Sequence, residues 1–102
     1  MQPAIAERRT GLIELCQRFR VRRLDLFGSA ASGAFDPARS DLDFLVEFEP
    51  HSPLRALDAF FGFKDGLEAL FGRPVDLVMT GAVTNPYLQA GIDASRETLY
   101  AA

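Results

Sequence analysis

The sequence contains no tryptophan, a single cysteine and a single histidine among its 102 residues. One cysteine excludes an intrachain disulfide and cannot by itself form a metal cluster. Because Cys16 falls within an amphipathic helical pattern, we expect it to be a buried bystander. The histidine, His51, stands beside Pro50 in a predicted loop, where nothing indicates a metal-binding or acid–base role. Neither residue type therefore supplies a candidate active site.

An excess of positive charge and long apolar runs are also missing. The formal net charge is −3, so the electrostatics give no general support for a nucleic-acid partner, and we expect no direct DNA binding. No apolar run approaches the roughly 20 residues of a membrane span. Residues 1–3 do not open a signal peptide. The sequence therefore predicts a cytoplasmic protein without a membrane partner.

Length and composition are those of one small globular domain. The chain is 48% hydrophobic and 25% charged, which is typical of a folded rather than a disordered protein. A chain of 102 residues can enclose a single modest core. We therefore expect residues 1–102 to form one domain.

Hydrophobic periodicity predicts alternating helices and strands. Apolar residues at three- and four-residue intervals predict helices over residues 4–19, 53–71 and 85–94, and a short helix or a loop follows Ser29. Alternating or continuous apolar runs predict strands over residues 21–27, 42–48, 75–79 and 97–100, the last at an edge. We expect an α/β (α+β) fold in which a small mixed sheet of about three to four strands packs with about four helices.

The second long helix has the clearest start and stop signals. Ser52 as the N-cap and Pro53 in the first turn predict where it begins. Gly62 and Gly66 lie within it and could bend or split it. Gly72, with a proline two positions later, predicts its end.

Gly28 and Ser29 directly follow the first predicted strand and precede small residues. Glycine lets backbone N–H groups approach an anion closely, and the N-terminus of a following helix presents more of them. The pair therefore has the sequence form of a phosphate cradle, although Gly-Ser also forms plain β-turns. The Gly-x-x-x-x-Gly-Lys-Ser/Thr pattern of a P-loop is absent from the sequence.

Two aspartates, Asp41 and Asp43, flank Leu42 at the start of the second predicted strand. Alternation along a strand puts both carboxylates on one face, a few ångströms apart. Hard oxygen ligands held side by side suit a divalent cation such as Mg²⁺, which an anion at Gly28 and Ser29 would share. A solvated strand end is the alternative. The residues after Asp43 are core-like, however, and a carboxylate entering a core needs a partner.

A third carboxylate, Asp76, lies within the otherwise apolar third strand. Polar residues alternate into strands frequently, so Asp76 alone would indicate little. If the second and third strands are neighbours, Asp76 projects to the same face as Asp41 and Asp43. Three clustered carboxylates repel one another unless cations lie between them. The three together therefore predict a metal site.

In this order and context, Gly28-Ser29, Asp41-Leu42-Asp43 and Asp76 resemble the signature of the DNA polymerase β-type nucleotidyltransferase superfamily. The small size of the chain further resembles the minimal nucleotidyltransferases that act as antitoxins of HEPN-domain toxins. The resemblance covers nearly the whole sequence. It implies a nucleotidyltransferase fold and a Mg²⁺-dependent enzyme that uses ATP.

The resemblance also implies roles for single residues. Asp41 and Asp43 would bind the nucleotide-associated Mg²⁺ ions, about two in number. Asp76 would bind the second ion and, together with it, act as the general base that activates the attacking hydroxyl. Gly28 and Ser29 would hold the β- and γ-phosphates through backbone and hydroxyl donors.

Two features depart from the pattern of the superfamily. The interval between Ser29 and Asp41 holds eleven residues, one more than the commonest spacing. The family often has an arginine before the glycine of this loop, where the present sequence has Ser32. We expect Arg39 to replace that charge and, with Ser40, to contact the nucleotide.

The favoured hypothesis is transfer of AMP from ATP to a hydroxyl, by resemblance a tyrosine of a cognate HEPN ribonuclease toxin. A second hypothesis is a non-catalytic antitoxin that neutralises its partner by direct contact. Its docking patch could be Phe60, Phe61 and Phe63, unless these side chains pack in the core. A third is nucleotidyl transfer to a small molecule or an RNA end, but the chain lacks the extra domain and the basic surface that such acceptors usually require.

Overall fold

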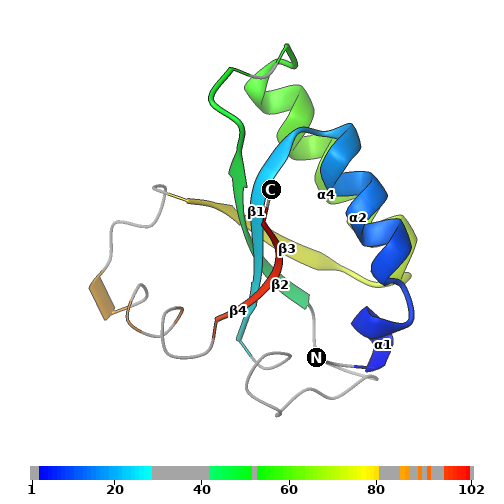
Figure 1. Ribbon diagram of the computed structural model, residues 1–102. Coiled ribbons are helices and arrows are strands. Elements are labelled where there is room, and N and C mark those ends of the chain that lie inside the picture. The colour runs from blue at the N-terminus through cyan, green and yellow to red at the C-terminus, as the bar shows by residue number, and fades with distance from the viewer. Residues whose placement is uncertain are drawn as a thin grey trace.

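The structure, a computed structural model of the chain, describes residues 3–28, 42–51, 53–80, 86–87, 90, 92 and 96–101. Its centre is a four-stranded mixed sheet (Figure 1). The strands are β1 (Val21–Phe27), β2 (Leu42–Phe48), β3 (Val75–Met79) and β4 (Glu97–Ala101). They lie in the order β3-β2-β1-β4, with β2 parallel to β3 and the other two pairs antiparallel. All four predicted strands are confirmed, and β4 lies at an edge as expected.

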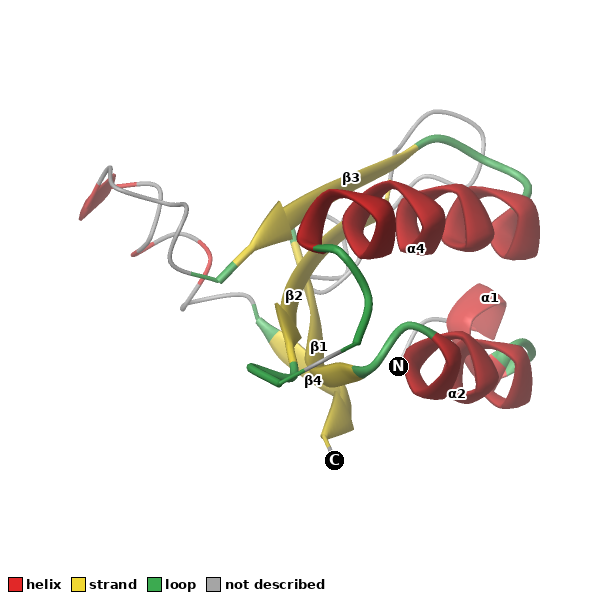
Figure 2. Cartoon of the chain, turned by 90° about the horizontal axis from the view of Figure 1, so that it is seen from above, coloured by secondary structure: helices red, strands yellow, loops and turns green. Residues whose placement is uncertain are grey.

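Three helices cover one face of this sheet (Figure 2): α1 (Pro3–Ala6), α2 (Arg9–Arg18) and α4 (Ala56–Phe71). α2 packs against α4 and β1, while α4 also packs against β3. We call the opposite side of the sheet, which points away from α2 and α4, the far face. Within the described ranges, no helix is long and apolar enough to cross a membrane.

The hydrophobic core lies between the sheet and the helices, because alternate strand residues point to one face. Leu42, Phe44 and Val46 of β2 are fully buried on the helix side. The ring of Phe44 stacks on that of Phe71 at the end of α4, with 5.9 Å between centroids. Cys16 of α2 is fully buried as predicted, and burial raises the pKa of its thiol to about 12.

The helices differ from the prediction in number and bounds. The described residues hold three helices rather than about four. The helix predicted over residues 4–19 is divided into α1 and α2, because the chain turns at Glu7 and Arg8. The N–H of Arg8 donates back to the carbonyl of Ile5 at 3.1 Å, which closes this turn. The short helix considered after Ser29 lies outside the described residues.

α4 begins at Ala56, three residues later than predicted, because Pro53 and Leu54 form a bend and Arg55 is the extended N-cap residue. Gly62 and Gly66 do not split the helix, which is continuous through both. The helix ends at Gly72 as predicted. Gly72 has a left-handed φ of 65° and donates its N–H to the carbonyl of Glu68 at 2.8 Å.

The helix predicted over residues 85–94 lies largely outside the described residues. Pro86, Tyr87, Ala90 and Ile92 are described, and each has helical backbone. Ile92 is only 2% exposed, so its side chain is buried.

Candidate active site

Three strand ends meet at one end of the sheet: β1 ends at Phe27, β2 begins at Leu42 and β3 begins at Val75. The pairing register aligns Phe27 with Asp43, and Asp43 with Asp76. The two predicted carboxylates of the described chain are therefore neighbours on adjacent parallel strands. Paired residues of a parallel sheet project to the same face, so Asp43 and Asp76 lie side by side on it.

Burial shows that this face is the far face. Leu42 and Phe44, on either side of Asp43, are fully buried toward the helices, and Val75 and Leu77 flank Asp76 in the same way. Asp43 itself is half-buried and Asp76 is exposed. The pair of carboxylates thus lies on the side of the sheet that the described helices leave uncovered.

Gly28 forms the third part of this arrangement. It turns the chain at the end of β1 with a left-handed φ of 73°. A Cβ atom added there would collide with Asp43 Oδ2 and would lie 3.3 Å from Asp43 Cγ. Only glycine satisfies both conditions, since other residues rarely adopt this φ and would carry the colliding atom. The backbone of Gly28 is therefore held directly against the Asp43 carboxylate.

The position of Asp76 is set by the connection between α4 and β3. After Gly72 ends the helix, a Glu68 Oε2 atom accepts the N–H of Val75 at 3.2 Å. The N–H of Leu42 donates to the carbonyl of Pro74 at 3.4 Å, which starts the pairing of β2 with β3. These bonds fix the register in which Asp76 faces Asp43.

The remaining predicted site residues, Ser29, Arg39, Ser40 and Asp41, lie outside the described residues. Within the described part, no group of three or more His, Cys, Asp or Glu residues could hold a metal ion. The described chain contributes two hard oxygen donors, Asp43 and Asp76, whose chemistry suits Mg²⁺. Asp41, two positions before Asp43, is the third donor that the sequence predicts.

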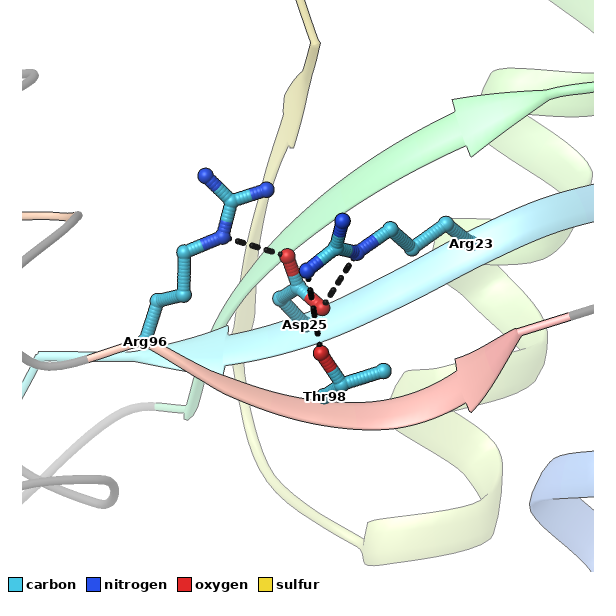
Figure 3. Close-up of polar contacts among 4 residues, drawn as sticks. All are labelled: Arg23, Asp25, Arg96 and Thr98. Carbon is cyan, nitrogen blue, oxygen red and sulfur yellow. Dashed lines mark hydrogen bonds and ion pairs between the residues drawn. The ribbon is translucent and has the colours of Figure 1, made fainter.

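A buried polar cluster on the far face was missed by the sequence analysis (Figure 3). Asp25 of β1 is only 1% exposed, although it is charged. Arg96 Nε donates to Asp25 Oδ2 at 2.7 Å, and Arg23 Nε donates to Asp25 Oδ1 at 3.1 Å. Arg23 also donates to the hydroxyl of Thr98 at 3.1 Å. The only sequence signal was one aspartate in an otherwise apolar stretch, which reads as ordinary strand alternation.

The pKa of the Asp25 carboxyl reflects two opposing influences. Burial, the larger single effect, acts to raise the pKa, while hydrogen bonds from Arg96, Thr98 and Arg23 together outweigh it. The pKa therefore lies below its ordinary value, and Asp25 is a carboxylate at neutral pH.

The phenylalanines considered as a docking patch divide between core and surface. Phe63 is fully buried, with its ring 6.0 Å from that of Phe19. Phe60 is partly buried against the core, whereas Phe61 is 56% exposed. Phe61 and Leu57 border a groove of about 330 Å³ between α4 and β3.

Asp43 is half-buried against Gly28, and Asp76 lies beside it on a parallel strand, which is an arrangement that suits a nucleotide-handling enzyme. The family of the nucleotidyltransferase domain matches residues 9–98. The chain belongs to this family and is a nucleotidyltransferase. Protein adenylyltransferase MntA of Thermococcus cleftensis is 39% identical over 89 residues, which cover 85% of this chain and 81% of that protein.

Solved structures agree on the fold. A chain described as a candidate minimal nucleotidyltransferase has a TM-score of 0.74 at 33% identity, covering 91% of this chain and 90% of its own. A chain from a toxin–antitoxin structure with AMP-PNP has a TM-score of 0.68 at 22% identity, and the match covers 92% of this chain and 73% of that chain. A third chain comes from a complex of tri-AMPylated Shewanella oneidensis HEPN toxin with MNT antitoxin. Its TM-score is 0.64 at 18% identity, and the match covers 95% of this chain and 72% of that chain. The fold is that of the minimal nucleotidyltransferases.

Proposed function

We propose that this protein is a Mg²⁺-dependent antitoxin that transfers AMP from ATP to a tyrosine hydroxyl of a cognate HEPN ribonuclease toxin in the cytoplasm. The observation that carries the proposal is the contact of Gly28 with Asp43, which is itself aligned with Asp76. This contact brings a predicted phosphate-binding turn and two carboxylates to one end of the sheet, in a chain of the nucleotidyltransferase family.

The phosphate-binding part of the proposal rests on the turn after β1. The left-handed φ of Gly28 lets the turn present backbone N–H groups to an anion without a side chain in the way. Ser29 would add its hydroxyl, and Arg39 and Ser40 would contact the triphosphate from the start of β2. These residues would hold the β- and γ-phosphates while the α-phosphorus is attacked.

The carboxylates form the other part. Asp41, Asp43 and Asp76 would hold Mg²⁺, which when bound supplies charge stabilisation to the phosphates and the leaving group. Asp76, the exposed member, lies on the edge strand β3, where an acceptor protein can approach. Its carboxylate would accept the proton of the acceptor hydroxyl. The hydroxyl oxygen then bonds to the α-phosphorus, the bond to the bridging oxygen breaks, and pyrophosphate leaves.

A protein acceptor is supported by the relatives. The Thermococcus cleftensis protein is named as a protein adenylyltransferase, and a fold neighbour comes from a complex with a tri-AMPylated HEPN toxin. The absence of a basic surplus, at a net charge of −3, gives no reason to prefer an RNA acceptor.

A washout experiment tests this proposal. The partner is incubated with the antitoxin, ATP and Mg²⁺, the antitoxin is then removed, and the ribonuclease activity of the partner is measured. Covalent AMP transfer predicts that the partner stays inactive after wild type and recovers after Asp43→Asn. Asp65→Asn, which neutralises an exposed carboxylate on α4, is the matched control and should behave as wild type. Full recovery after incubation with wild type would contradict the proposal.

A second candidate function is neutralisation by direct contact without catalysis. It is favoured by the exposed apolar side chains Leu57 and Phe61, which are 71% and 56% exposed. In that case Asp43→Asn would inhibit the partner as well as wild type does while bound, and the partner would recover from both after washout.

A further inference from the structure

Glu68 lies in the last turn of α4 and accepts two hydrogen bonds from the chain that follows it. Its backbone carbonyl accepts the N–H of Gly72 at 2.8 Å, and its side-chain Oε2 accepts the N–H of Val75 at 3.2 Å. Figure 2 shows the short connection that these two bonds span, from the end of α4 to the start of β3. One residue therefore ties the end of the helix to the start of the strand that carries Asp76.

The peptide between Pro74 and Val75 is held from both sides. Its carbonyl accepts the N–H of Leu42 on β2 at 3.4 Å. A trans peptide points its C=O and N–H in opposite directions, so the N–H of Val75 points away from β2, where Glu68 accepts it. In the described sheet β3 is an edge strand with β2 as its neighbour. The Glu68 carboxylate thus takes the place of a strand partner on the open side of β3.

This held peptide determines where the Asp76 carboxylate lies. Val75 is 2% exposed, with its side chain in the core, so the next residue projects to the far face. Asp76 itself is exposed, and burial of its own side chain therefore does little to fix its position. The core contact of Val75 and the bond from Glu68 are what hold the backbone immediately before it.

The other carboxylate of the site is held by different contacts. Phe44, the residue after Asp43, stacks on Phe71 with 5.9 Å between ring centroids. Asp43 also lies directly against Gly28 at the end of β1. Neither contact involves the Glu68 side chain. Loss of the bond from Glu68 would therefore move Asp76 while Asp43 keeps its place against the proposed phosphate-binding turn.

We propose that Glu68 is a positioning residue for AMP transfer, which holds the N–H of Val75 so that the Asp76 carboxylate can accept the proton of the acceptor hydroxyl. The role rests on the function proposed above, in which Asp76 is the base. It requires an acceptor oxygen at the reach of a glutamate side chain and does not require negative charge. A displacement of about 1 Å at a reacting group can lower a rate about a hundredfold, so a single hydrogen bond of this kind can affect turnover.

Three substitutions of Glu68 separate reach from charge. Glu68→Gln keeps the length and an oxygen acceptor, Glu68→Asp keeps the charge on a shorter side chain, and Glu68→Ala removes both. Asp65→Ala is the matched control, because it removes an exposed carboxylate from the same helix. Melting curves define a temperature at which the variants are folded. If Glu68→Ala does not fold, Glu68→Asp replaces it in the comparison.

Three measurements are made on each folded variant. Kinetics of AMP transfer to the cognate partner give kcat and the KM for ATP. Calorimetry with AMP-PNP and Mg²⁺ gives nucleotide binding. Hydrogen exchange of the Val75 amide, followed by NMR, reports directly on the bond to Glu68.

We expect Glu68→Ala and Glu68→Asp to lower kcat about tenfold or more and to speed exchange of the Val75 amide. The KM for ATP and the binding of AMP-PNP should stay within about twofold of wild type, because Asp43 and Gly28 are not displaced. Glu68→Gln should keep kcat within about threefold, since its side-chain oxygen can still accept the bond. Asp65→Ala should behave as wild type.

Two results would overturn the role of Glu68 and leave the proposed function intact. An active Glu68→Asp with an inactive Glu68→Gln would mean that the charge matters and the reach does not. An unchanged kcat in Glu68→Ala, despite faster exchange of the Val75 amide, would mean that the bond serves stability alone. If wild type transferred no AMP, the proposed function and the role of Glu68 would fail together.

Discussion

Three aspartates on the far face, Asp25, Asp43 and Asp76, share a residue type but differ in their surroundings. Asp25 is 1% exposed and is satisfied by arginines, so it is a fixed structural anion. Asp43 is half-buried against Gly28, and Asp76 is exposed. The sequence predicted that Asp43 and Asp76 would share a face if β2 and β3 were neighbours, and the pairing of these two strands meets that condition. It could not reveal that Asp25 is buried, because its partner Arg96 lies 71 residues away along the chain.

We predict that alanine cannot replace Gly28 without loss of stability and activity. Gly72 provides a control for this prediction. Gly28 and Gly72 both have a positive φ, but a Cβ at Gly72 meets nothing within 4 Å. Gly72→Ala should therefore lose only about 1 kcal/mol of stability from backbone strain. Gly28→Ala should lose more, because it also displaces the Asp43 carboxylate, and should abolish AMP transfer. The measurement is urea unfolding of both variants together with an assay of AMP transfer. Equal losses of unfolding free energy, with AMP transfer retained in both variants, would argue against the contact between Gly28 and Asp43.

The Asp25 cluster should make stability depend on pH at the acid end. The pKa of Asp25 is lowered from 3.8 on folding. Its contribution is therefore fully present above pH 3.8 and is lost as the pH falls through the folded pKa. Asp25→Asn should lower the free energy of unfolding by about 1–3 kcal/mol at neutral pH, since the arginines are partly exposed.

Urea unfolding of wild type and Asp25→Asn, from neutral pH to below pH 3.8, measures how much the Asp25 carboxylate contributes to the free energy of unfolding. The difference between the two proteins should shrink as the medium becomes more acidic. A difference that stays constant into strong acid would mean that the carboxylate charge contributes nothing.

At the scale of elements, three glycines let α2 and α4 approach closely. A Cβ at Gly11 or Gly66 would lie 2.8 or 2.7 Å from a side chain of the opposing helix, and a Cβ at Gly62 would lie 2.7 Å from the ring of Phe19, the C-cap residue of α2. Sequence reasoning treats a helical glycine as a weak point, because glycine lowers helix propensity. Here the absence of a glycine side chain leaves room for side chains of the facing segment, and α4 remains continuous. This packing depends on contacts between residues far apart along the chain, so local propensity could not predict it.

Gly62→Ala and Gly66→Ala should differ although both improve helix propensity by about 1 kcal/mol. The new methyl group at Gly66 meets the flexible end of Leu15, which can move aside. At Gly62 it meets the ring of Phe19, which is packed against Phe63. We expect Gly66→Ala to be neutral or slightly stabilising, and Gly62→Ala to lose about 1 kcal/mol or more. Melting curves that rank Gly62→Ala as the more stable variant would refute this packing.

For the whole molecule, the order of the strands determines where the site lies. The chain passes from β2 through α4 to the parallel strand β3, and only this crossover places Asp76 beside Asp43. The sequence predicted each strand from its own pattern, but the order β3-β2-β1-β4 results from pairing between distant segments. The start of α4 was also predicted too early, because Pro53 forms a bend before Arg55.

Mg²⁺ should stabilise the folded protein, because the proposed carboxylates lie close together only in the fold. Excess Mg²⁺ at about ten times its dissociation constant should add about 1.4 kcal/mol to the unfolding free energy. Asp43→Asn should remove most of this gain, and Asp65→Asn should retain it. The measurement is a melting curve with and without Mg²⁺, with chelator as the blank. A gain of equal size in all three proteins would indicate nonspecific ion binding instead.

Intact-mass spectrometry of the cognate partner is the most direct test of AMP transfer at this site. The partner is incubated with ATP and Mg²⁺ together with wild type, Asp43→Asn or Asp65→Asn. The account predicts that the partner gains the mass of one or more AMP groups with wild type and with Asp65→Asn, and none with Asp43→Asn. An unmodified partner in all three reactions, still bound and inhibited by this protein, would contradict enzymatic AMP transfer and favour neutralisation by contact.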